Sequence, residues 1–258
     1  CVRPVVRKWG HWVWCLSTNQ HWKWPQHRPA LRQWRRPTRP GETTKSWEQT
    51  VETALRLAPD SLTIYQMELP YNTVFVKSSK DNGEATPVAD WPTKRAWVDW
   101  AFNRFVEAGY SISSAYTLVR DPKEVEFQYR DMLWEGSDLV ALGVASFGHL
   151  SGIHYQNKTH WDDYLGAIDA QQLPLGRGLV ARPRELLIRE LVLGLKKGSV
   201  DTARLSNKFG VDPVVEWSQA WDELSKLGFL EPIETTESPQ LTRSGLLQVD
   251  SLLNRFFD

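Results

Sequence analysis

The sequence is poor in cysteine and in long apolar runs. Only Cys1 and Cys15 occur among 258 residues, so a disulfide framework is not expected. No apolar stretch approaches the ~20 residues that a membrane span needs. The first residues show neither the apolar core of a secretory signal nor an initiator Met. These absences argue against export and membrane insertion and favour a cytoplasmic protein.

Acidic residues are missing from the first part of the chain. All 31 acidic residues lie from Glu42 onward, whereas nine of the 31 basic residues precede it and 22 follow it. Residues 42 to 258 therefore carry a net charge of about −9, against an excess of positive charge before Gly41. Six of the 14 tryptophans also fall in residues 1 to 41, without helical or strand periodicity. The composition thus changes near Gly41.

Residues 1 to 41 admit different interpretations. Interleaved Arg and Trp could stack on bases or lie at an anionic membrane surface. Out-of-frame translation of GC-rich DNA also yields this mixture of residues, and we interpret the segment as non-native or disordered. His11, His21 and His27 lie beside the cysteines, but their spacing matches no standard zinc pattern. No metal site is therefore predicted here.

From Gly41 the pattern indicates an α/β fold. Thr43 or Thr44 is the expected N-cap of a helix over Lys45 to Leu57. A strand is expected over Ser61 to Glu68. Further strands are expected at Tyr110 to Val119 and Asp138 to Ala145, helices at Thr93 to Ala108, Pro183 to Lys197, Asp201 to Phe209 and Asp212 to Leu227, a hairpin at Phe229 to Leu241, and a helix from Thr242.

The turn from Gly143 to Gly148 is a candidate binding site. Small residues let a ligand approach the backbone closely, and barrel active sites form at the C-terminal ends of strands. Trp161 and Tyr164 follow on a helix, where their spacing favours a packing role.

The last part of the chain, residues 179 to 258, suggests a winged-helix-like domain. Its expected recognition helix carries one basic residue, Lys226, which favours repulsion of phosphates, and DNA binding is not expected. The acidic residues of that helix are Asp212, Glu216, Asp222 and Glu223.

Several motifs occur in a particular order. They are Gly41-Glu-Thr-Thr with Trp47, Leu62-Thr-Ile-Tyr-Gln-Met, Ala108-Gly-Tyr, Asp138-Leu-Val-Ala-Leu-Gly-Val-Ala-Ser, and Tyr155-Gln-Asn. Together they resemble the oxygen-independent coproporphyrinogen III oxidases and their heme-chaperone relatives, which are radical S-adenosylmethionine (SAM) proteins. The resemblance implies the C-terminal part of an incomplete (β/α)6 barrel, residues 42 to 178, followed by the winged-helix-like domain.

The resemblance also implies cofactors. Members hold a [4Fe–4S] cluster through a C-x-x-x-C-x-x-C loop, because thiolates suit soft iron, and they bind SAM and a tetrapyrrole nearby. That loop, the first four barrel strands and the Gly-rich SAM-binding strand have no counterpart here. We therefore predict no catalytic residue and no oxidoreductase activity on a porphyrinogen or heme from this chain alone.

Site residues follow from the same resemblance. Tyr65 and Gln66 would line the barrel, and the backbone of Gly143, Ala145 and Ser146 would border SAM or substrate.

An alternative function is a non-catalytic module for heme transfer. In it His149 and His154 could ligate heme iron. The resemblance leaves open which tetrapyrrole is bound. A partial barrel would also leave the edge of the strand Leu62 to Glu68 uncovered, which favours aggregation or dimerisation.

Overall fold

The computed structural model describes residues 2–8, 11–16, 41–68, 76–77, 81, 88–232 and 238–257, with side chains from Gly41 onward. It has helices and sheets, as the predicted α/β class requires. Its contacts divide the chain into two compact units, Cys1–Glu126 and Phe127–Asp258. The boundary expected between residues 178 and 179 lies inside the second unit and stays a prediction; within that unit, residues 131–135 are bonded to Arg189, Lys197 and Arg204. Arg189, for example, donates to the Leu133 carbonyl at 3.4 Å.

Two helices form one layer of the first unit, α1 (Thr44–Leu57) and α3 (Trp91–Glu107). Thr43 is the N-cap of α1, and its hydroxyl accepts from the Ser46 N–H. The indole of Trp47 donates to the Trp97 carbonyl at 2.8 Å and joins the two helices. The sequence-based prediction of α1 and its cap is confirmed.

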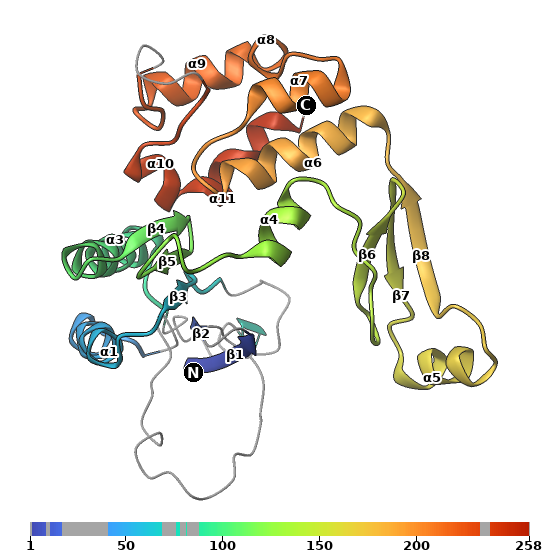
Figure 1. The fold of residues 1–258 in the computed structure, drawn as a ribbon, viewed down its shortest axis with the longest axis horizontal. Helices are drawn as coiled ribbons and strands as arrows, with labels where there is room; N and C mark the ends of the chain where they lie inside the picture. Colours follow the sequence, from blue (N-terminus) through green and yellow to red (C-terminus); the bar gives the residue numbers. More distant parts are fainter. Residues whose placement is uncertain are drawn as a thin grey trace, which may run out of the picture. The chain divides into compact units, whose positions relative to one another are not determined.

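The sheet of the first unit has the strand order β1-β2-β3-β5-β4 (Figure 1). Strand β2 runs parallel to β3, whereas β5 runs antiparallel to both β3 and β4. Strand β5 therefore separates β3 from β4, the two strands that α3 connects. The strands are β1 (Val2–Lys8), β2 (His11–Leu16), β3 (Ser61–Ile64), β4 (Ser111–Ser114) and β5 (Thr117–Val119).

Three expectations for this sheet are corrected. The predicted strand Tyr110 to Val119 is a hairpin that turns at residues 115 and 116. The predicted strand Ser61 to Glu68 ends at Ile64. Strand β3 lies between β2 and β5, so its edge is paired rather than uncovered. Backbone hydrogen bonds between strands accompany these differences, and side-chain periodicity does not report them.

The basic Trp-rich segment contributes two strands that its composition does not indicate. Strands β1 and β2 pair antiparallel, and Val13 to Leu16 of β2 align with Ser61 to Ile64 of β3. Ladder hydrogen bonds come from the backbone, so they form without an alternating pattern. Residues 17–40 and the side chains of the segment lie outside the described residues. The proposed base-stacking and membrane-surface roles of this segment therefore remain predictions.

The second unit contains helices and a three-stranded antiparallel sheet, order β6-β7-β8. Strand β8 leads into α6, and α5 lies at the other end of the sheet (Figure 1). The sheet consists of β6 (Phe147–Leu150), β7 (Ile153–Asn157) and β8 (Leu175–Val180), and the helices are α4 (Gln128–Trp134), α5 (Trp161–Asp169), α6 (Pro183–Leu195), α7 (Thr202–Phe209), α8 (Pro213–Glu216), α9 (Ser218–Lys226), α10 (Arg243–Leu247), α11 (Val249–Leu252) and the 3-10 helix η3 (Leu253–Phe256).

The C-terminal helices agree with the sequence in outline. Helices α6 and α7 begin at or within one residue of the expected positions, whereas the expected helix Asp212 to Leu227 is interrupted at Trp217. Within the expected hairpin, the described residues form an antiparallel bridge between Leu230 and Leu241. The assignment of this region as winged-helix-like stays a prediction.

Candidate functional site

The segment before β6 is a turn rather than the predicted strand Asp138 to Ala145. Only Leu139 forms a bridge there, with His149. The side chains of Val140 and Leu142 are 62% and 83% exposed, so the apolar run is not the buried strand that its composition suggests. Gly143 has φ 100° and bends the chain away from an extended course.

Four polar side chains from later in the chain hold this turn, Ala141 to Ser146. Asn157, which is 3% exposed, donates to the carbonyls of Ala141 at 3.2 Å and Gly143 at 2.9 Å. Gln156 donates to the Ala145 carbonyl at 3.0 Å. The hydroxyls of Tyr155 and Tyr164 accept from the backbone N–H groups of Ala141 at 2.9 Å and Gly143 at 3.1 Å.

The backbone donors of the three predicted ligand-contacting residues are all used within the fold. The Gly143 N–H is bonded to Tyr164, the Ala145 N–H donates to the Lys158 carbonyl at 2.9 Å, and the Ser146 N–H to the Gly143 carbonyl at 3.5 Å. The Ser146 hydroxyl donates to the Leu142 carbonyl at 2.8 Å. The exposed surface of the turn is therefore offered by side chains such as Leu142.

The turn also contains an unusual backbone conformation. Ala145 has φ 59°, the left-handed region that residues with a Cβ seldom adopt. Such a residue costs roughly 1–3 kcal/mol and persists where its surroundings fix it, often at functional sites. Here Gln156 and the Lys158 carbonyl bond both polar backbone groups of Ala145. The turn is thus a fixed feature of the fold.

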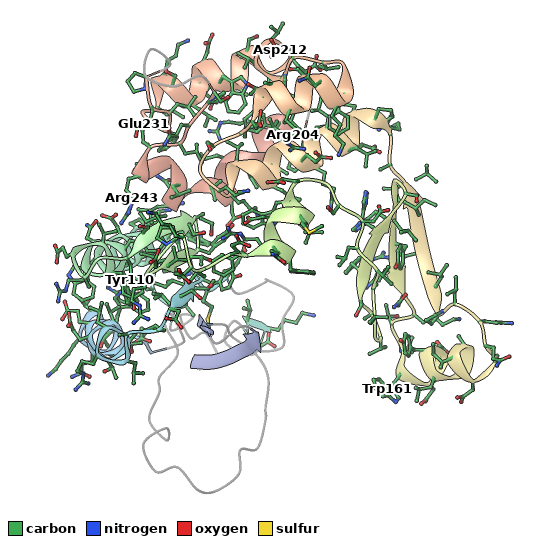
Figure 2. The ribbon with its side chains drawn as sticks, in the orientation of Figure 1. Tyr110, Trp161, Arg204, Asp212, Glu231 and Arg243 are labelled. Carbon is green, nitrogen blue, oxygen red and sulfur yellow. The ribbon has the colours of Figure 1, made fainter. Side chains whose placement is uncertain are left out.

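Of the two residues for which helical spacing predicts a packing role, Trp161 does not have it. Trp161 is 62% exposed and extends from α5 (Figure 2), whereas Tyr164 binds the backbone of the turn. Sequence reasoning missed Asn157 and Tyr164 as positioning residues, although the Tyr155-Gln-Asn motif contains the first of them.

The remaining predicted residues, Tyr65 and Gln66, belong to the first unit. They follow β3 directly, and the Tyr65 ring lies 5.2 Å from that of Tyr116, tilted by 32°. Tyr65 is 44% exposed. The two groups of predicted site residues thus lie in separate units, and each is positioned by its own unit.

Lys94 holds the segment after β3, and sequence reasoning missed it. Its side chain is buried on α3, donates to the Met67 carbonyl at 2.8 Å, and lies 4.5 Å from the centre of the Trp91 ring. Burial lowers the pKa of its ammonium group, and Glu68 and Asp90 oppose that shift. The sequence contains one signal of this role: a cation such as Lys94 in the first turn of a helix interacts unfavourably with the helix dipole.

Lys94→Met is expected to remove a pH dependence of stability. The folded lysine releases its proton below 10.5, the value for the free side chain. Between the lowered pKa and 10.5 the unfolded state therefore binds more protons, and the free energy of unfolding rises with pH. The advantage of the parent over the variant should grow across that interval, by up to about 1.4 kcal/mol per pH unit. Urea unfolding at several pH values measures it. Lys45→Met, at an exposed position of α1, is the control, and an equal trend in both variants would contradict the prediction.

His149 and His154 face each other on β6 and β7. His149 is 6% exposed and its Nδ1 has no hydrogen-bond partner, whereas His154 is exposed and stacks on Phe147 with ring centres 5.7 Å apart. Among the residues that the structure describes, no three His, Cys, Asp or Glu side chains gather into a metal-binding group. No described helix has the length and apolar character to cross a membrane.

Comparison with known proteins identifies three curated relatives, all oxygen-independent coproporphyrinogen III oxidases. The protein of Pseudomonas aeruginosa is 24% identical over 233 residues, covering 84% of this chain and 49% of the relative. That of Thermostichus vulcanus is 23% identical, covering 67% and 56%, and that of Helicobacter pylori 20%, covering 84% and 50%. No protein-family model matches the chain.

A solved structure has the same fold. Coproporphyrinogen III oxidase of Escherichia coli, a radical SAM enzyme, superimposes with a TM-score of 0.65 at 16% identity, covering 84% of this chain and 52% of the enzyme. The predicted resemblance is therefore confirmed. The chain spans about half the length of the curated relatives that it matches.

Proposed function

We infer from the similarity to oxygen-independent coproporphyrinogen III oxidases that this chain corresponds to the C-terminal half of a radical SAM oxidoreductase acting on a tetrapyrrole. One observation carries the proposal: the family-like turn Ala141 to Ser146 is held by Tyr155, Gln156 and Asn157, which form the last motif of the resemblance. Two separate motifs thus form one rigid feature, with Leu142 directed to solvent. We propose that this turn borders the substrate.

Binding of a stable tetrapyrrole tests the proposal. Coproporphyrin III should quench the tryptophan fluorescence of the chain, and Asn157→Ala should weaken the binding at least tenfold, because the turn loses two hydrogen bonds. The same variant should lower stability by about 1–3 kcal/mol, so cooperative unfolding must be verified first. Asn254→Ala, at an exposed position of η3, is the matched control. No binding by the parent chain, or equal binding by Asn157→Ala, would contradict the proposal.

The residues of this chain do not fit a [4Fe–4S] cluster. A cluster needs three thiolates at close spacing, whereas the whole sequence has two cysteines, and Cys15 lies within strand β2. We propose that the chain alone does not cleave SAM. After reconstitution with iron and sulfide under a strong reductant, we expect no 5′-deoxyadenosine above the protein-free background by chromatography. Its formation in stoichiometric amounts would overturn this proposal.

Heme transfer is a second candidate, supported by the exposed His154 stacked on Phe147. A macrocycle can reach this imidazole from solvent, whereas His149 is covered. Heme titration should then shift the Soret band in the parent and in His149→Phe, but not in His154→Ala. An unchanged shift in the His149→Ala, His154→Ala double variant would count against this function.

A further inference from the structure

The two facing histidines are held close by the geometry of their hairpin. Strands β6 and β7 are joined by Ser151 and Gly152, with φ 50° and 77°, as in a tight two-residue turn of type I′. This turn sets the register in which His149 lies opposite His154. Both imidazoles therefore project from the same face of the sheet.

The pair is also of the closer kind found in antiparallel sheets. The backbone N–H and carbonyl of His149 are bonded to Leu139, at 2.8 and 2.6 Å, and so point away from His154. Pairs without mutual backbone bonds bring their side chains nearer together. The two ring centres are 6.1 Å apart, with the planes inclined by 43°.

Neither ring is committed to another polar partner within the described structure. Nδ1 of His149 is buried without a hydrogen-bond partner, and buried polar atoms in native proteins rarely remain so. The stack with Phe147 positions the ring of His154 beside it. Two imidazoles with available nitrogens thus lie on one rigid hairpin.

We propose that His149 and His154 form a two-imidazole chelate for a divalent first-row transition ion such as Zn²⁺, Ni²⁺ or Cu²⁺. Imidazole suits these ions. Metal–nitrogen distances of about 2.0–2.1 Å bring two ring centres to about 5–6 Å, so small rotations of the rings suffice. Since no described third ligand gathers there, the other coordination positions are open to water or to an external ligand.

Both basic and acidic side chains lie near His149. Arg189 lies near the His149 ring, and so do the carboxylates of Asp138 and Glu190. The Arg189 guanidinium, however, opposes a bound cation. Arg189→Gln should therefore bind the ion several-fold more tightly, which an unrelated surface site would not do.

Calorimetric titration of the full chain with Zn²⁺ tests the proposal, after alkylation of both cysteines. We expect His154→Ala, an exposed position, and His149→Phe, which preserves burial, each to weaken this binding event at least tenfold. His160→Ala, at the exposed N-cap of α5, should change it less than twofold. With Cu²⁺, electron paramagnetic resonance should report two nitrogen ligands in the parent and lose one in His154→Ala. Unchanged Zn²⁺ binding in His154→Ala would overturn the proposal, even if His149→Phe fails to fold.

Discussion

The double substitution Arg204→Met, Lys208→Met is expected to lower the free energy of unfolding by about 3 kcal/mol. Both cations are on α7 and bind Glu190 of α6, each at 2.7 Å (Figure 2, Arg204). The carboxylate side chain is 4% exposed, whereas Arg204 and Lys208 are 34% and 44% exposed. The substitutions therefore leave a buried negative charge without its partners.

A third substitution separates charge burial from lost packing. Glu190→Met, added to the double variant, removes the uncompensated charge and should restore a large part of the lost stability, because apolar replacements of buried ion pairs are often nearly neutral. Urea unfolding of all three proteins measures the differences. If the triple variant is less stable than the double variant, the carboxylate is not the source of the loss.

Gly245→Ala is expected to destabilise the chain by about 1–3 kcal/mol. Gly245 lies in α10, where a Cβ would be 2.4 Å from the Phe229 carbonyl oxygen and 3.2 Å from Leu241 Cδ2. Backbone atoms cannot rotate away as a side chain can, so α10 must shift. Alanine favours helices over glycine by about 1 kcal/mol, so the close contact must outweigh that gain.

Gly166→Ala is the matched control. It lies in α5, and its Cβ would meet no atom within 4 Å, so helix propensity alone should act. This variant is expected to be more stable than the parent by up to about 1 kcal/mol. Thermal unfolding of the two variants should therefore show shifts of opposite sign. Shifts of the same sign would show that contact at Gly245 is not the deciding term.

The helices and the family resemblance were accessible from the sequence. The N-cap of α1, the boundaries of α6 and α7, and the helical character of α3 and α5 depend on residues within about four positions of each other. The motifs that indicate the family are short and contiguous, and a relative that covers 84% of the chain confirms the resemblance. These features depend on residues close together in the chain, so the sequence is enough to predict them.

The strand pairing and the site required the tertiary structure. Strand β5 lies between β3 and β4, Asn157 reaches back to the turn at Ala141, and Lys94 is buried although it occupies a polar position in the helix pattern. Each of these features depends on a partner more than ten residues away. Backbone geometry and the need of buried polar groups for hydrogen-bond partners determine which residues meet. Composition and periodicity indicated which elements form, and the short motifs indicated which family they resemble, whereas only the packed chain decided which polar groups meet.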